Sequence, residues 1–109
     1  MARTAVLICF NIDSEKFESN YERNKFFRGL YGWKQTVRIE RKKYIYHRDG
    51  LLDEMKFMKI DQSSFVIEPE EFQKIMSFFK GWHEKVIWKK FEILLEEDMK
   101  KFFEEDEDG

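Results

Sequence analysis

Cysteine, proline and glycine are scarce in this sequence: its 109 residues contain one Cys, one Pro and five Gly. The single Cys9 excludes an intramolecular disulfide and a cysteine-based zinc cluster, so we expect a reducing, cytoplasmic compartment. The longest uncharged run, Thr4 to Ile12, is too short for a transmembrane helix, and no small-residue cleavage site of a secretory signal follows it. The glycine-rich loops GxxxxGK[ST] and GxGxxG are also missing, which argues against enzymes that bind nucleotides through such loops.

What the sequence has in abundance is charge, with 20 Lys and Arg against 22 Asp and Glu, and the two signs are segregated. Residues 1–50 contain 11 basic and 6 acidic side chains, whereas residues 51–109 contain 9 and 16. All six arginines precede residue 49. The net charge of −2 therefore conceals a basic segment, 23–48, with nine bases and one acid. The abundance of Lys and Glu is compatible with a thermophilic source.

Hydrophobic periodicity predicts alternating strands and helices. We expect a buried strand at Ala5–Phe10, then a helix from about Glu15 to Leu30 that Ser14 caps and whose apolar side includes Tyr21. A half-exposed strand follows from Trp33, with Lys43–His47 as its hairpin partner or its continuation. The later elements are a strand at 57–67, a helix from Pro69 to Gly81 with Phe72, Ile75, Met76 and Phe79 on one side, a strand at 85–94, and a short helix ending at Phe103.

This order is typical of an α+β fold with a ferredoxin-like split βαβ sandwich. We expect an antiparallel sheet of four to five strands, two helices on one of its faces and a short C-terminal helix. A 42% hydrophobic share supports a single domain over residues 1–103, and the acidic residues 104–109 are expected to be a flexible tail.

The basic segment is the strongest functional signal. Lysines and arginines that neutralise phosphates are interleaved there with rings on which bases stack, which is the composition of a nucleic-acid-binding surface. The alternative is a solvated strand face whose charges the acidic half balances. We expect contacts with RNA or DNA through ten residues: Arg28, Trp33, Lys34, Arg38, Arg41, Lys42, Lys43, Tyr44, Tyr46 and Arg48.

Catalytic signals are weaker. Asp13, at the end of the first strand, is a candidate Mg²⁺ ligand, and Asp49 and Asp53 are further candidate ligands, but capping and turn formation explain these carboxylates as well. His47 beside Arg48 is a candidate acid or base for phosphodiester cleavage. We expect no cofactor unless such a nuclease activity exists, in which case the ion is Mg²⁺.

Several short segments resemble one family. They are Cys9-Phe10-Asn11-Ile12, Leu30-Tyr31-Gly32, Gln62-Ser63-Ser64-Phe65-Val66 and Glu70-Glu71-Phe72-Gln73-Lys74-Ile75. Together they are similar to the small ferredoxin-fold protein of CRISPR spacer acquisition and the related virulence-associated D-type ribonucleases. The resemblance implies a homodimer that handles DNA or RNA. The family's Tyr-Asp is Phe10-Asn11 here, so its metal-dependent nuclease activity would need Asp13 as a substitute, and Trp33–Asp61 looks like an insertion.

The sequence therefore predicts a small cytoplasmic, homodimeric protein that binds RNA or DNA through a basic, aromatic β-ribbon, without catalysis and without a membrane. The alternatives are a metal-dependent endonuclease and a protein-interaction module in which the oppositely charged ends mediate assembly.

Overall fold

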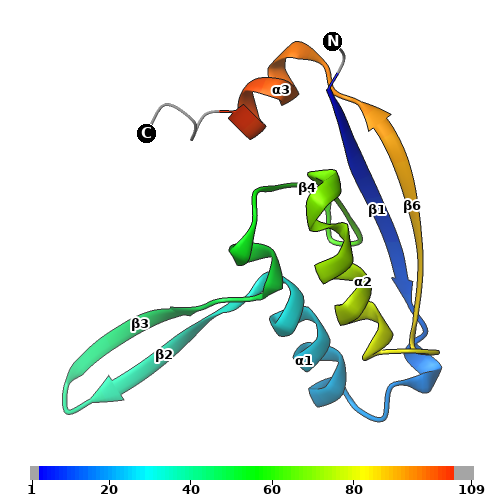
Figure 1. The fold of residues 1–109 in the computed structure, drawn as a ribbon. Helices are drawn as coiled ribbons and strands as arrows, with labels where there is room; N and C mark the ends of the chain where they lie inside the picture. Colours follow the sequence, from blue (N-terminus) through cyan, green and yellow to red (C-terminus); the bar gives the residue numbers. More distant parts are fainter. Residues whose placement is uncertain (1–2, 105–109) are drawn as a thin grey trace.

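A computed structural model describes residues 3–104, which form an α+β fold with a four-stranded antiparallel sheet and three α-helices (Figure 1). The strands of this main sheet lie in the order β4-β5-β1-β6. Their bounds are β1 Thr4–Ile12, β4 Phe57–Asp61, β5 Ser64–Ile67 and β6 Val86–Leu94, and the helices are α1 Asn20–Tyr31, α2 Phe72–Lys80 and α3 Glu97–Glu104. Of the predicted acidic tail at 104–109, residues 105–109 lie outside the described part of the chain.

The core lies between one face of the main sheet and helices α1 and α2. Because side chains alternate along a strand, Val6, Ile8 and Phe10 of β1 point to the same face, and all three are buried. Phe26 of α1 and Phe79 of α2 contact Phe10, with ring centroids 5.7 and 5.6 Å apart. The side chains of β1 that alternate with this set point to the far face.

Helix α3 covers one end of that far face. Phe103 of this helix and Leu95, which precedes the helix, are buried against Ala5 of β1 and Val66 of β5. The part of the far face that α3 leaves uncovered keeps two large apolar side chains of β6 exposed, Phe91 in the middle of the strand and Ile87 near its start.

Helix α1 begins five residues later than the sequence predicts. Asp13 accepts a hydrogen bond from the backbone N–H of Glu15, which stabilises a single 3₁₀ turn, η1 (Ser14–Lys16). The chain then becomes extended, and Ser19 caps α1 by accepting from the N–H of Glu22. Helix α2 confirms the predicted pattern, with Ile75 and Phe79 fully buried after a turn, η3 (Pro69–Glu71), that proline opens.

The segment predicted as one strand at 57–67 is two strands, β4 and β5, joined by a tight turn. The carboxylate of Asp61 accepts hydrogen bonds from the Ser63 N–H at 2.7 Å and the Ser64 hydroxyl at 2.9 Å. These two hydrogen bonds hold the pKa of Asp61 below its usual range, and the bond from Ser63 has the larger effect. The single-strand prediction was wrong because a side chain, and not Gly or Pro, makes this turn.

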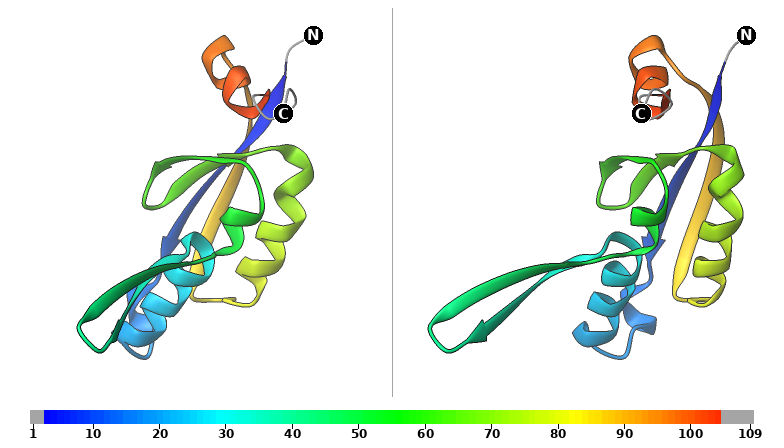
Figure 2. Two further views of the ribbon diagram at one scale, coloured as in Figure 1. Left: turned by 90° about the vertical axis from the view of Figure 1, so that its left-hand side faces the viewer. Right: turned by 60° about the vertical axis from the view of Figure 1, so that its left-hand side comes forward.

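Strands β2 (Trp33–Ile39) and β3 (Lys42–Arg48) form a separate two-stranded sheet, which we call the arm (residues 33–48). The arm leaves the body of the protein beside α1 and projects away from it, as Figure 1 and the right-hand view of Figure 2 show. The hairpin alternative left open by the sequence is therefore the correct one. Its two-residue turn contains no glycine, and Glu40 takes up a left-handed φ of 58°.

In the part of the chain that the structure describes, no helix is both long enough and apolar enough to cross a membrane.

Candidate nucleic-acid interface

The root of the arm is a close crossing of two backbones. The chain enters the arm after Gly32 and leaves it at Gly50, and a Cβ atom on Gly50 would lie 2.2 Å from the Gly32 nitrogen. Gly32 itself has a φ of 82°, a left-handed conformation that suits glycine. Asp53, in the 3₁₀ turn η2 (Leu51–Glu54), accepts a 2.8 Å hydrogen bond from the Gly50 N–H. These contacts hold together the two points where the arm joins the body, which are the start of β2 and the end of β3.

Alternation along the arm divides its side chains into two faces. Directly opposed residues share a face, and Trp33 is opposite Arg48 while Lys34 is opposite His47. We call the two sets the aromatic face (Trp33, Gln35, Val37, Ile39, Lys42, Tyr44, Tyr46 and Arg48) and the basic face (Lys34, Thr36, Arg38, Lys43, Ile45 and His47).

The aromatic face carries rings with cations beside them. The guanidinium of Arg48 lies 5.6 Å from the Tyr46 ring centroid, and its Nε donates a 2.6 Å hydrogen bond to the Gln35 side chain. Arg28, from helix α1, covers the Trp33 ring at 4.2 Å. Tyr44 and Tyr46 are exposed, 39% and 44% of each residue being accessible. Rings with free faces and held cations suit base stacking.

The basic face is exposed along its whole length. Within residues 3–104, its Lys34, Arg38 and Lys43 form no ion pair, and neither do Arg41 at the turn and Lys42 on the other face. No carboxylate of the acidic half therefore pairs with any of these five side chains within the described structure. Nine of the ten predicted contact residues belong to the arm, and Arg28 lies at its root. The structure brings these residues onto one projecting element, with the three rings on one face and three of the six lysines and arginines of the arm on the other.

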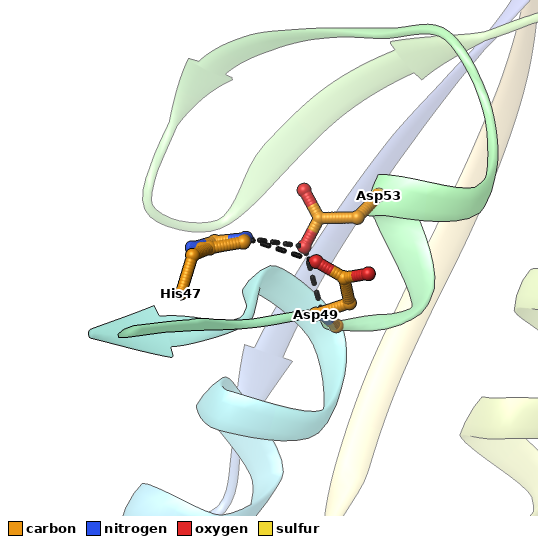
Figure 3. A network of polar contacts seen from close by, with 4 residues as sticks. His47, Asp49 and Asp53 are labelled. Atoms are coloured by element: carbon orange, nitrogen blue, oxygen red, sulfur yellow. Dashed lines mark hydrogen bonds and ion pairs between the residues drawn. The ribbon is translucent and has the colours of Figure 1, made fainter. Parts of the chain in front are cut away.

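A second group of predicted residues meets at the root. His47 Nε2 lies 3.1 Å from Asp53 Oδ2 and 3.3 Å from Asp49 Oδ1 (Figure 3). One ligand atom from each of these three residues falls within 4.8 Å of the others. An imidazole nitrogen and carboxylate oxygens are ligands for divalent metals such as Zn²⁺ and Mn²⁺. All three residues are exposed, and Asp53 also has the structural role described above.

Asp13, the other predicted metal ligand, does not belong to this group. Its backbone N–H donates to the Lys85 carbonyl at 2.8 Å, and its carboxylate caps η1. The capping alternative raised for Asp13 by the sequence is therefore correct in part, because Asp13 caps the turn η1, whereas Ser19, and not Asp13 or Ser14, caps helix α1.

The structure also shows a pocket that the sequence did not indicate. A cavity of about 300 Å³ lies between the exposed side of α1 and the root of the arm. We call it the α1 pocket; it is lined by Tyr21, Lys25, Arg28, Gly29, Trp33 and Asp49. Tyr21 was predicted on the apolar side of this helix together with Leu30. Leu30 is buried as predicted, but Tyr21 is 75% exposed and Phe26 is buried instead. The spacing of Tyr21, Lys25 and Arg28 at i, i+4 and i+7, which places them on one side of a helix, could have revealed this pocket.

Comparison of the whole chain with models of known protein families, with curated proteins and with solved structures gave no match.

Proposed function

We propose that this protein binds RNA or DNA through the arm. The observation that carries the proposal is the arm itself, a basic and aromatic β-ribbon that projects from the body and whose lysines and arginines include five without an ion pair in the described structure. A two-stranded ribbon is narrow enough to enter a nucleic-acid groove or to support a single strand. An isolated ribbon of this kind is also marginally stable in water, which favours a role in contacting a partner.

We also propose the ferredoxin-like class for the main sheet. Strands β1 and β4 flank α1 along the chain with β5 between them in the sheet, and β5 and β6 flank α2 with β1 between them. Two interleaved split βαβ units of this kind support that class. The arm is then an insertion between α1 and β4.

The salt dependence of binding tests the proposed function. In the triple variant Lys34→Ala, Arg38→Ala, Lys43→Ala, we expect weaker binding and a slope of log K against log salt that is smaller by about 2 to 3. The control variant Lys16→Ala, Lys80→Ala, Lys101→Ala has the same net charge, removes three exposed lysines from the body, and is expected to bind as the wild type does. Absence of binding to both single-stranded and duplex nucleic acid at low salt would overturn the proposal.

The cluster of His47, Asp49 and Asp53 favours a second candidate function, a metal-dependent nuclease. These residues would hold a divalent ion at the root of the arm, where it would activate water beside a bound phosphodiester. Cleavage of RNA or DNA that requires Mg²⁺ or Mn²⁺ and is lost in Asp49→Asn would support this candidate. Asp13→Asn is the control and is expected to retain the activity. Intact substrate under all these conditions would leave binding as the function.

A further inference from the structure

The α1 pocket combines the groups that hold a nucleotide. Two cations, Lys25 and Arg28, line it together with two rings, Tyr21 and Trp33. Arg28 already covers the Trp33 ring, so Tyr21 offers the accessible ring face. Asp49 is the one carboxylate in the lining. A phosphate would be repelled by Asp49 and attracted by Lys25 and Arg28, which orients it toward the helix.

The size and position of the pocket point to one unstacked nucleotide. Its volume of about 300 Å³ is at the small end of the range for small-molecule sites, and a duplex does not fit such a space. Trp33 belongs both to the pocket and to the aromatic face of the arm. Tyr44 and Tyr46 follow on that face, about 6.6 Å apart along β3. A strand that stacks its bases on these tyrosines is thereby led to the pocket.

We propose that the α1 pocket binds a single unstacked nucleotide of a single-stranded RNA or DNA whose neighbouring nucleotides lie along the aromatic face. This inference rests on the proposed function and makes it more specific, because bases that stack on protein rings must first be free of base pairing.

Binding of a short single-stranded oligonucleotide and of a duplex of the same length tests the proposal. We expect Tyr21→Ala to weaken single-strand binding by roughly 5- to 100-fold, and Tyr21→Phe, which keeps the ring, to bind like the wild type. Lys25→Ala is expected to weaken binding and to reduce the salt slope by about 0.7. Duplex affinity should stay unchanged in all three. Tyr21 and Lys25 are exposed, so these changes are not expected to affect folding.

The controls are Phe102→Ala and Lys80→Ala, which remove an exposed ring and an exposed lysine from α3 and α2. Wild-type single-strand affinity in Tyr21→Ala and Lys25→Ala, with loss in the Lys34, Arg38, Lys43 triple variant, would overturn the pocket and leave the proposed function standing. An equal loss of single-strand and duplex affinity in Tyr21→Ala would also overturn the pocket. No binding of either nucleic acid by the wild type would overturn both.

A nucleoside monophosphate gives an independent measurement. We expect it to shift the NMR signals of the Trp33 indole N–H and of the Lys25 and Arg28 amides, and to leave those of Trp88, on the far strand β6, unchanged. The same titration of Tyr21→Ala should produce much smaller shifts. Shifts of equal size in Tyr21→Ala would contradict stacking on this ring.

Discussion

Tyr31 ends helix α1 and ties it to the turn between β4 and β5. Its hydroxyl donates a 2.8 Å hydrogen bond to the Gln62 carbonyl, and the Lys59 ammonium lies 4.4 Å from its ring centroid. Burial raises the pKa of the Tyr31 phenol to about 12, with a further contribution from the negative charge of Asp61. The phenol therefore keeps its proton in the folded protein at pH values where it ionises in the unfolded chain.

This raised pKa predicts a loss of stability in alkali. Between pH 10 and about 12 the folded state binds more protons than the unfolded state at Tyr31, so the free energy of unfolding falls as pH rises. In Tyr31→Phe we expect a shallower fall over this window, measured by chemical denaturation at a series of pH values. Tyr21→Phe removes an exposed phenol from the same helix and serves as the control. Identical pH dependence in wild type and Tyr31→Phe would contradict this role.

Single residues also show where the sequence was insufficient at the candidate site. The proposed contact residues of the arm followed from composition, because lysine, arginine and aromatic side chains are concentrated in one segment. The α1 pocket did not follow from composition, because a tyrosine such as Tyr21 occurs both on the buried apolar side of a helix and on its exposed side. The sequence indicated Asp49 and Asp53 as candidate metal ligands, but it did not indicate that they lie beside His47. That proximity depends on the close backbone contact between Gly32 and Gly50.

At the scale of elements, hydrophobic periodicity predicted those elements that bury one side in the core. Helix α2 packs Ile75 and Phe79 on the core, so its apolar pattern was clear, whereas β6 buries only Val86. The turns at Glu40 and Gln62 lack the usual Gly or Pro, and their positions were therefore missed or left open. The separation of the arm from the main sheet was not predicted, because an alternating strand does not reveal which strand it pairs with.

The arm is expected to be dispensable for folding. None of its residues belongs to the buried core clusters, and its two ends lie next to each other at the root. We predict that replacing residues 34–47 by an Asn-Gly turn, which joins the opposed Trp33 and Arg48, leaves cooperative unfolding intact, with a midpoint temperature within about 5 °C of the wild type.

Circular dichroism and thermal denaturation measure this outcome. The same replacement should abolish nucleic-acid binding, so that a folded and inactive variant separates the two properties. A shortened protein that fails to fold would show that the arm supports the body of the protein.

At the scale of the whole molecule, the arm makes the protein extended. The Cα radius of gyration is 16.4 Å, whereas a compact domain of this length has about 13 Å. Positive charge is concentrated on the arm, while the acidic residues lie mainly in the second half of the chain. This separation of charge attracts a polyanion to the arm and disfavours its approach to the body.

The homodimer predicted from the sequence needs an apolar interface, and we expect it at the uncovered part of the far sheet face. Ile87 and Phe91 of β6 are 63% and 49% exposed there. We predict that the wild type sediments as a dimer and that Phe91→Lys shifts it to monomer, because a second copy would bury this ring. Phe102→Lys, on α3, is the control and should remain dimeric. A monomeric wild type at all concentrations would refute the dimer.

The crossing of Gly32 and Gly50 has a mechanical consequence for the molecule. Strands of seven residues extend about 23 Å from this single attachment, so a rotation of about 10° at the root displaces the tip by about 4 Å. The arm can therefore act as a lever whose pivot, Gly32 and Gly50, lies next to Trp33 and Asp49, two residues that line the α1 pocket. A rotation of the arm about this point would move Trp33 relative to Arg28, and it would thereby couple contacts at the tip of the arm to the shape of the pocket at its base.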